Sequence, residues 1–154
     1  MPDMIEQRDL LLLHLLQDNA RLSNAELADQ TAMSTSSCWR RVKALEDQGV
    51  ISRYTAVIDP PSMGLRFEAI VHIQLNRHDR AGVDLFMETV LQRGEVVDCV
   101  ATTGTADYHL RVICRDIEAY NSFLEEVLFA MPCLRSAQTN MVLKRIKTNG
   151  PVQA

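Results

Sequence analysis

The chain has 154 residues, of which 47% are hydrophobic, and it carries a formal net charge of −4. This length allows one or two small domains with a hydrophobic core but no large catalytic scaffold, and the hydrophobic fraction excludes extensive disorder. The negative net charge argues against a general polyanion-binding protein, although it leaves room for a local basic patch.

The cysteines and the apolar runs bound the class of protein further. Cys38, Cys99, Cys114 and Cys133 have no Cys-x-x-Cys spacing and no histidine at zinc-finger spacing. We therefore expect reduced core thiols in a cytoplasmic protein, with no metal site and no cofactor. The leucine-rich segment near the N-terminus is too short for a signal sequence, and no apolar run reaches the roughly 20 residues that span a bilayer. We expect no membrane contact.

The first part of the chain has helical periodicity. Apolar residues in 5–18 recur at the spacing of an amphipathic helix. Ser23, followed three residues later by Glu26, is typical of a capping box that begins a second, short helix. A third helix is expected from Ser34 to Gly49. Three helices with a short middle helix and compact turns predict a helix-turn-helix.

The third helix gathers hydroxyls and basic charge on one face. Cys38, Val42 and Leu45 recur at i, i+4 and i+7, so they mark the buried direction, and the opposite face carries Arg40 and Lys43. A recognition helix enters the DNA major groove by its N-terminal half, where Arg binds guanine and Ser binds bases or phosphates. The predicted DNA-binding residues are Ser34, Thr35, Ser36, Ser37, Arg40, Arg41 and Lys43.

An ordinary solvated helix face is the alternative interpretation of this pattern. It is weakened because the segment from Ser34 to Ala44 contains no acidic residue, although the first 60 residues contain more acids than bases. Trp39 lies at the edge of the buried stripe, and we expect it to pack against a neighbouring helix.

Pro60 and Pro61 separate the two parts of the chain, because consecutive prolines end regular structure. The segment "VISRYTAVI" before them has the composition of a strand. We therefore expect a winged helix-turn-helix domain over 1–50, a strand linker over 51–60 and a second domain over 61–154.

The second part alternates strands and helices. The expected order is a strand at 67–75, a helix at 80–94 with Val83, Phe86, Met87, Val90 and Leu91 facing inward, strands at 96–104 and 107–115, a helix at 117–131 and a final strand within 134–147. The order βαββαβ predicts a ferredoxin-like domain, an antiparallel sheet with both helices on one face, and hence an α+β protein.

The sheet face without helices has a mixed composition. Alternation along the strands assigns Ile70 and His72 to it, together with His109 and Ile113. Isoleucines at these positions make the face too apolar for plain surface, so a second subunit is the expected cover.

The segments 21–64 and 102–112 ("TTGTADYHLRV"), followed by the terminal "KRIK", resemble the leucine-responsive/asparagine regulator (Lrp/AsnC) family of transcription factors. The resemblance covers almost the whole chain. It implies a double-stranded DNA partner, a dimer through the C-terminal domains that assembles further into tetramers or octamers, and a free amino acid as the effector, bound between dimers.

The effector site follows from the same resemblance. It assigns the effector loop to "TTGTAD", where backbone N–H groups around Gly104 would hold the α-carboxylate and Asp107 the α-ammonium. The alternative for Asp107 is a turn residue that caps its own backbone. The implied effector residues are Thr103, Gly104, Thr105, Asp107, Phe129, Thr139 and Met141.

Two other functions stay open at this point. A dimeric ferredoxin-like enzyme would use His72 and His109 as catalytic residues, but it would leave residues 1–50 without a purpose, and no catalytic motif occurs in the chain. An amino-acid sensor that binds a protein partner instead of DNA would differ in salt dependence, because DNA binding releases counterions.

Overall fold

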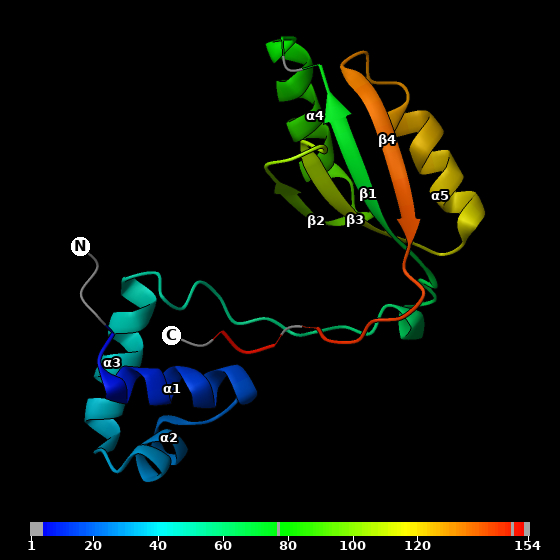
Figure 1. Ribbon diagram of the computed structural model, residues 1–154. Coiled ribbons are helices and arrows are strands. Elements are labelled where there is room, and N and C mark those ends of the chain that lie inside the picture. The colour runs from blue at the N-terminus through cyan, green and yellow to red at the C-terminus, as the bar shows by residue number, and fades with distance from the viewer. Residues whose placement is uncertain (1–4, 77, 149, 153–154) are drawn as a thin grey trace. The chain divides into compact units, whose positions relative to one another are not determined.

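The computed structural model describes residues 5–76, 78–148 and 150–152 (Figure 1). The chain forms two compact units, one containing the residues up to Val57 together with those from Lys147 onward, and the other Ile58–Ile146. This division differs from the expected domains at the C-terminus, where the last residues were assigned to the second domain. They join the first unit because the Gln17 side chain binds the backbone of Val152.

The first unit is built from α1 (Gln7–Asp18), α2 (Asn24–Thr31) and α3 (Thr35–Asp47). Its core is formed by Leu12, Leu27, Ala28 and Cys38, so each helix contributes to one small cluster. Cys38 is completely buried, as its place on the apolar stripe predicts. The helix-turn-helix is therefore confirmed.

Local capping determines where the second and third helices begin. The Ser23 hydroxyl accepts from the backbone N–H of Glu26 at 3.2 Å, while the Glu26 carboxylate accepts from the backbone N–H of Ser23 at 2.7 Å. These reciprocal bonds are the predicted capping box. At α3, the Ser34 hydroxyl accepts from the backbone N–H of Ser37 at 3.2 Å.

The strand expected in the linker is absent: residues 50–58 have no strand conformation in the described structure. The backbone N–H of Ile51 donates to the carbonyl of Leu45, which belongs to the end of α3. A strand exists only with a neighbour that takes its N–H and C=O groups, and composition alone supplies no such neighbour. The prediction of a strand linker was wrong for the single chain.

The second unit contains an antiparallel sheet in the order β2-β3-β1-β4, with the helices packed on it (Figure 1). After a short 3-10 turn η1 (Pro61–Met63), its elements are β1 (Phe67–Leu75), α4 (Arg80–Gln92), β2 (Val96–Ala101), β3 (Tyr108–Cys114), α5 (Ile117–Phe123), the π-helical turn η2 (Leu124–Leu128) and β4 (Leu134–Met141). The expected βαββαβ order and the α+β class are confirmed.

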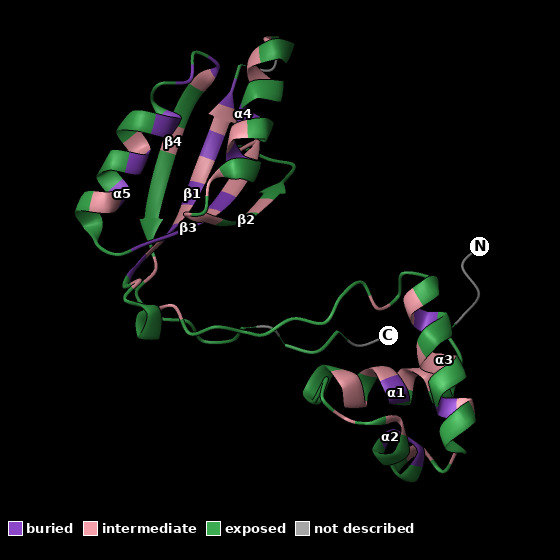
Figure 2. Cartoon of the chain, turned by 180° about the vertical axis from the view of Figure 1, so that it is seen from behind, coloured by how far each residue is buried: buried purple, intermediate pink, exposed green. Residues whose placement is uncertain are grey.

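The central strand β1 organises the core of this unit. Buried and half-buried residues alternate along it, and Ala69, Val71 and Ile73 are completely buried on the side that meets the helices (Figure 2). From α4, Phe86 is completely buried against this core. β4, at the edge of the sheet, is mostly exposed (Figure 2).

Two residues expected to face inward on α4 do not. Met87 and Leu91 keep 42% and 83% of their surface exposed. The buried stripe of α4 is narrower than predicted, because the helix contacts a flat sheet along the line of Val83, Phe86 and Val90.

The helix-free face of the sheet is more polar than expected. The carboxylate of Glu68 binds the guanidinium groups of both Arg111, at 2.6 Å, and Arg145. Ile113, expected to be exposed there, is only 5% exposed within the single chain. Ile70 is half-buried. Of the two isoleucines expected on this face, Ile70 is therefore the one that keeps accessible surface, and the case for a second subunit here is weaker than expected.

All four cysteines are free thiols: Cys38, Cys114 and Cys133 are buried and Cys99 is partly buried. Burial raises the pKa of each thiol above its ordinary value. They are therefore protonated core residues near neutral pH, in agreement with the expectation of reduced thiols.

The capping box of α2 generates a prediction about stability. Ser23→Ala should lower the free energy of unfolding by about 1 kcal/mol at pH 7, because the first turn of α2 loses its acceptor. Ser122→Ala, an exposed serine inside α5, is the control and should change stability little. Urea denaturation measures both variants, and equal midpoints would contradict the prediction.

The same box has a defined pH dependence. The backbone N–H of Ser23, and then its hydroxyl, lower the pKa of Glu26 below 4.5. A carboxylate with a lowered pKa stabilises the fold above its unfolded-state pKa and loses that contribution as pH falls through the folded-state value. The difference between wild type and Ser23→Ala should therefore shrink in denaturation series below pH 4.5.

Candidate nucleic-acid interface and effector loop

The start of α3 exposes a row of hydroxyl groups. Ser34 uses its hydroxyl as the helix cap and lies 3.3 Å from the hydroxyl of Ser36. Thr35 and Ser36 are exposed, and Ser37 is half-buried. Hydroxyls at a helix N-terminus, beside free backbone N–H groups, form a surface suited to phosphate oxygens.

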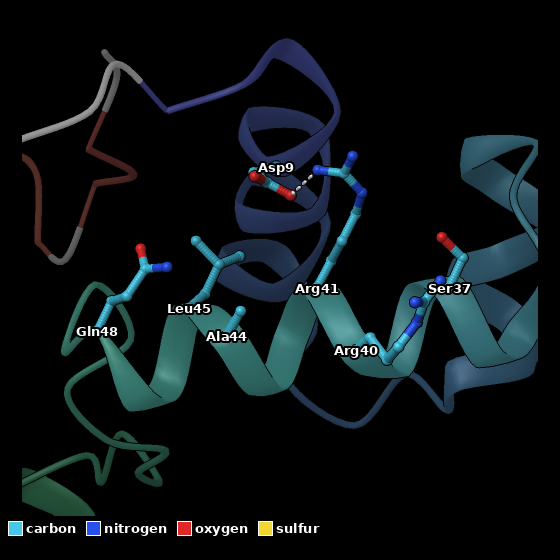
Figure 3. A pocket seen from close by; sticks show the side chains of 7 residues that line it. All are labelled: Asp9, Ser37, Arg40, Arg41, Ala44, Leu45 and Gln48. Carbon is cyan, nitrogen blue, oxygen red and sulfur yellow. Dashed lines mark hydrogen bonds and ion pairs between the residues drawn. The ribbon is translucent and has the colours of Figure 1, made fainter.

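The basic residues of α3 have different surroundings. Arg40 is exposed and forms no ion pair within the part of the chain that the structure describes. Arg41 binds Asp9 at 2.8 Å (Figure 3) and Glu6, just before α1, also at 2.8 Å. Lys43 lies 2.9 Å from Asp47, one turn along its own helix. Arg40 is thus the most available of the predicted basic contacts.

Arg41 holds α3 against α1. Its hydrogen bond to Asp9, and next that to Glu6, raise the pKa of the guanidinium, so it stays charged at every relevant pH. Asp47 does the same for the pKa of Lys43. The Lys43 pair is exposed and within one helix, so DNA phosphates can displace Asp47 at little cost. To bind DNA, Arg41 would instead have to break its ion pairs with both Glu6 and Asp9.

A hollow of about 310 Å³ lies beside Arg40 and Arg41 (Figure 3). Its lining residues come from α3 and from Asp9 of α1, and the drawn Arg41–Asp9 ion pair spans from one helix to the other. It is lined by Asp9, Ser37, Arg40, Arg41, Ala44, Leu45 and Gln48.

Trp39 does not pack as expected. It stays 54% exposed and lines a hollow with Leu27 of α2 and Tyr54. Tyr54 donates its phenolic hydroxyl to Glu46 at 3.0 Å, which holds the segment after α3 close to this helix. The Trp ring covers only the edge of the small helical core, because three short helices leave too little surface to bury it.

The loop between β2 and β3 is closed by its own hydrogen bonds. The backbone N–H of Thr102 donates to the carbonyl of Asp107 at 3.0 Å, and the Thr102 hydroxyl donates to Ala106. Gly104 has φ of 118°, a conformation that side-chain-bearing residues rarely adopt. Thr103, Gly104 and Thr105 are exposed at its tip.

Asp107 joins this loop to the end of β1. Its backbone N–H donates to the carbonyl of Ile73, and its carboxylate accepts from the backbone N–H of Leu75, both at 2.8 Å. The side chain therefore has a structural partner on the neighbouring strand. A carboxylate accepts several hydrogen bonds, so this role and ligand binding are compatible.

A hollow of about 660 Å³ adjoins the loop, and Asp107 and Thr105 line it. Gln74 and Arg135 also line it, so it contains an acid and a base. Sequence reasoning missed both residues: Gln74 is one polar residue in an alternating strand, and nothing near Arg135 indicates that its strand starts beside the loop. The Gln74 amide donates to the carbonyl of Thr105, which links the loop to β1.

The other predicted effector residues are not joined to the loop within one chain. Thr139 and Met141 lie on β4 opposite Val71 and Ala69, whereas the loop meets the end of β1 at Ile73. β4 and β3 flank β1 on opposite sides, about 10 Å apart. The Thr139 hydroxyl is bonded to that of Tyr120.

Phe129 and Met141 are 57% and 56% exposed. Phe129 follows the π-helical turn η2, and its backbone N–H bonds the carbonyl of Leu124. Large apolar side chains at this exposure are available to a ligand or to another copy of the chain. Neither residue lines the hollow beside the loop 102–107.

His72 and His109 are neighbours on β1 and β3, with ring centroids 4.6 Å apart in an edge-to-face arrangement. Their Nε2 atoms bond Asn140 and Thr102, each at 2.8 Å. Among the residues that the structure describes, neither ring has a carboxylate partner of the kind that orients a catalytic histidine.

Among the described residues, no three His, Cys, Asp or Glu side chains are grouped to hold a metal ion. In the same part of the chain, no helix has the length and apolar character needed to cross a membrane.

Two family profiles match the chain. A winged helix-turn-helix DNA-binding profile matches residues 5–52, and the Lrp/AsnC ligand binding domain matches residues 68–152. The two matches coincide with the helical segment that carries α3 and with the sheet that carries the effector loop.

Relatives extend over the whole chain. The transcriptional regulator AzlB of Bacillus subtilis is 29% identical over 144 residues, which cover 94% of this chain and 92% of the relative. The DNA-binding transcriptional activator DecR of Escherichia coli is 31% identical, with coverage of 97% and 100%.

Solved structures agree with these relatives. The transcriptional regulator NMB0573 of Neisseria meningitidis, in a complex with L-Met, superposes with a TM-score of 0.92 at 33% identity and covers 97% of both chains. AsnC of E. coli superposes with a TM-score of 0.85 at 25% identity, with coverage of 94% and 96%. These relatives are regulators and not enzymes. The chain belongs to the Lrp/AsnC family of DNA-binding transcriptional regulators, with an amino-acid-responsive ligand domain.

Proposed function

We propose that this regulator contacts double-stranded DNA through the N-terminal half of α3 and responds to a free amino acid at the loop 102–107. The observation that carries the proposal is the exposed start of α3, where three hydroxyl-bearing residues precede the exposed Arg40. A protein that acts on chromosomal DNA in this way would work in the cytoplasm.

The DNA contact uses two kinds of side chain. Ser34, Thr35 and Ser36 lie at the helix start, where hydroxyls and the helix dipole favour phosphate. Arg40 lies one turn further along, where a guanidinium reaches the O6 and N7 atoms of guanine. Lys43 joins them if DNA displaces Asp47, whereas Arg41 positions the helix from behind.

The amino-acid site would use the polar groups at the loop. A free amino acid presents an ammonium and a carboxylate, and Asp107 offers a carboxylate to the first. The exposed N–H groups around Gly104, or the Arg135 guanidinium in the adjoining hollow, would take the second. Because NMB0573 was solved with L-Met, a medium-sized apolar amino acid is the first effector to test.

The ligand would complete its site between copies of the chain. Phe129, Thr139 and Met141 lie away from the loop in one chain, so a second dimer would bring them to it. An effector bound in this way favours one assembly over another, which is how it would change DNA affinity.

Dimerisation would use the segments that leave the compact units. Val57 and Ile58 before β1 are 74% and 61% exposed, and Leu143 and Ile146 after β4 are 90% and 86% exposed. Extended apolar segments without a partner are suited to pair with the same segments of a second chain. The exposure of these four residues now supports dimerisation better than the sheet face with Ile70 and Ile113, because Ile113 is already buried within one chain.

The first prediction separates the two arginines of α3. Arg40→Ala should weaken binding to a cognate promoter fragment by about 1–3 kcal/mol without changing the melting temperature, because it removes a groove contact. Arg41→Ala should instead lower the melting temperature, because Glu6 and Asp9 lose their partner. Gel-shift titration and thermal unfolding measure the two effects.

Unchanged DNA affinity in Arg40→Ala would remove it from the interface. Wild-type affinity should also fall steeply as salt rises. Salt-independent binding of a protein partner would favour the sensor alternative.

The second prediction concerns the effector charge. Asp107→Asn keeps an oxygen that accepts from the backbone N–H of Leu75 but loses the negative charge. Effector affinity should fall about tenfold or more, while DNA affinity without effector stays at the wild-type value. Calorimetric titration with the amino acid found by thermal screening, starting with L-Met, measures it. Equal affinities in both proteins would leave Asp107 with its structural role alone.

The third prediction concerns assembly. At micromolar concentration the full chain should scatter light as a dimer or a larger oligomer, and Leu143→Ser with Ile146→Ser should shift it toward monomer. Leu91→Ser, 83% exposed on α4, is the control for exposed leucine and should leave the dimer intact. A monomeric wild type would refute dimerisation, and an unchanged double variant would move the interface elsewhere.

A further inference from the structure

The C-terminal segment returns to the helix-turn-helix unit and binds α1. The side-chain amide of Gln17 pairs with the backbone of Val152 in both directions: the Val152 N–H donates to Oε1 at 2.7 Å, and Nε2 donates to the Val152 carbonyl at 3.2 Å. These two residues are 135 positions apart. Gln17 lies in the last turn of α1, which ends at Asp18.

The contact recognises the backbone of the segment. Val152 is 80% exposed, so its side chain contributes little. The glutamine amide has the donor and acceptor that a neighbouring strand would present, so it pairs with both backbone groups of one residue. Pro151 has no N–H and a fixed φ, which favours an extended approach. Val152 thereby lies at a largely apolar hollow of about 470 Å³ between α1 and residues 50–55.

The other end of α1 is tied to the recognition helix. Arg41 of α3 binds Asp9 in the first turn of α1 and Glu6 just before it. Asp9 and Gln17 are eight residues apart, about 12 Å along the helix. A single short helix therefore contacts the C-terminal segment at one end and α3 at the other.

The same segment is joined covalently to the ligand domain. β4 ends at Met141, and the backbone N–H of Val142 still donates to Glu68, so the ordered sheet ends only a few residues before Lys147. Val152 is thus eleven residues from the end of β4 along the chain.

We infer that residues 150–152 are a docking arm, joined covalently to the ligand domain, that acts through Gln17 and α1 on the recognition helix. The docking rests on the contacts above, and its role in regulation rests also on the proposed function. Two exposed hydrogen bonds hold the arm weakly, because each raises the equilibrium constant for docking by a factor of about two to ten. An arm held by so little can be released by a ligand of ordinary affinity.

Backbone recognition makes matched variants available in the full chain. Val152→Pro removes the N–H that Gln17 accepts from, whereas Val152→Ala keeps it. Gln17→Ala removes the whole contact, whereas Gln7→Ala changes an exposed glutamine at the start of the same helix. Amide exchange of residue 152, followed by NMR, should be about two- to tenfold faster in Gln17→Ala than in wild type, Gln7→Ala and Val152→Ala.

Regulation is measured as the ratio of DNA affinities with and without saturating effector, starting with L-Met. Val152→Pro and Gln17→Ala should move this ratio at least about twofold toward one, with calorimetric effector affinity unchanged. Val152→Ala and Gln7→Ala should keep the wild-type ratio.

Equal exchange in all proteins would overturn the docking, and equal ratios would overturn its role in regulation. Exchange that quickens on dilution in step with subunit dissociation would overturn docking within one chain. If wild type bound neither DNA nor an amino acid, the proposed function would fail, while the exchange rate of residue 152 would still decide whether the arm docks.

Discussion

The ion pairs of Arg41 with Glu6 and Asp9 determine which face of α3 meets solvent. Cys38 and Leu45 bury one stripe of the helix, but a small apolar stripe allows some rotation. Two carboxylates on one guanidinium restrict that rotation, because the guanidinium is planar and binds carboxylates in a directed geometry. The outward direction of Arg40 and of the hydroxyls at the helix start depends on this constraint.

A comparable constraint acts in the ligand domain. Asp107 binds the backbone at the end of β1, and Gln74 binds the backbone of Thr105, so the loop between β2 and β3 is held to the central strand at two points. β1 is also the strand whose buried residues carry the core. A ligand at this loop would therefore lie next to the strand that carries the core of the sheet. The exposed residues at the far side of the domain would report that change to another copy of the chain.

The segments before β1 and after β4 expose large apolar side chains in the single chain. Val57, Ile58, Leu143 and Ile146 expose apolar surface on either side of the ligand domain, while the arm beyond Lys147 docks on α1. Both features lie next to the sheet in the sequence, before β1 and after β4, which are paired neighbours. The proposed assembly surface and the proposed arm therefore lie on segments that flank the same two paired strands.

The sequence by itself determined several features that depend on neighbours within about one helical turn or along one strand. The capping box at Ser23 and Glu26, the buried direction of Cys38 and the bounds of β1 belong to this class, because periodicity and local hydrogen bonds specify them. The antiparallel sheet and the α+β class followed from the order of elements, since βαββαβ units pack in few ways.

Only the tertiary structure decided contacts between distant residues. Arg41 meets Glu6 and Asp9 across more than 30 positions, and Gln17 meets Val152 across 135. The burial of Ile113, the exposure of Leu91 and the missing strand at 50–58 are of the same kind. Each depends on which surface lies opposite, and a chain specifies that surface only when its folded elements pack, because burial and pairing are properties of two elements together.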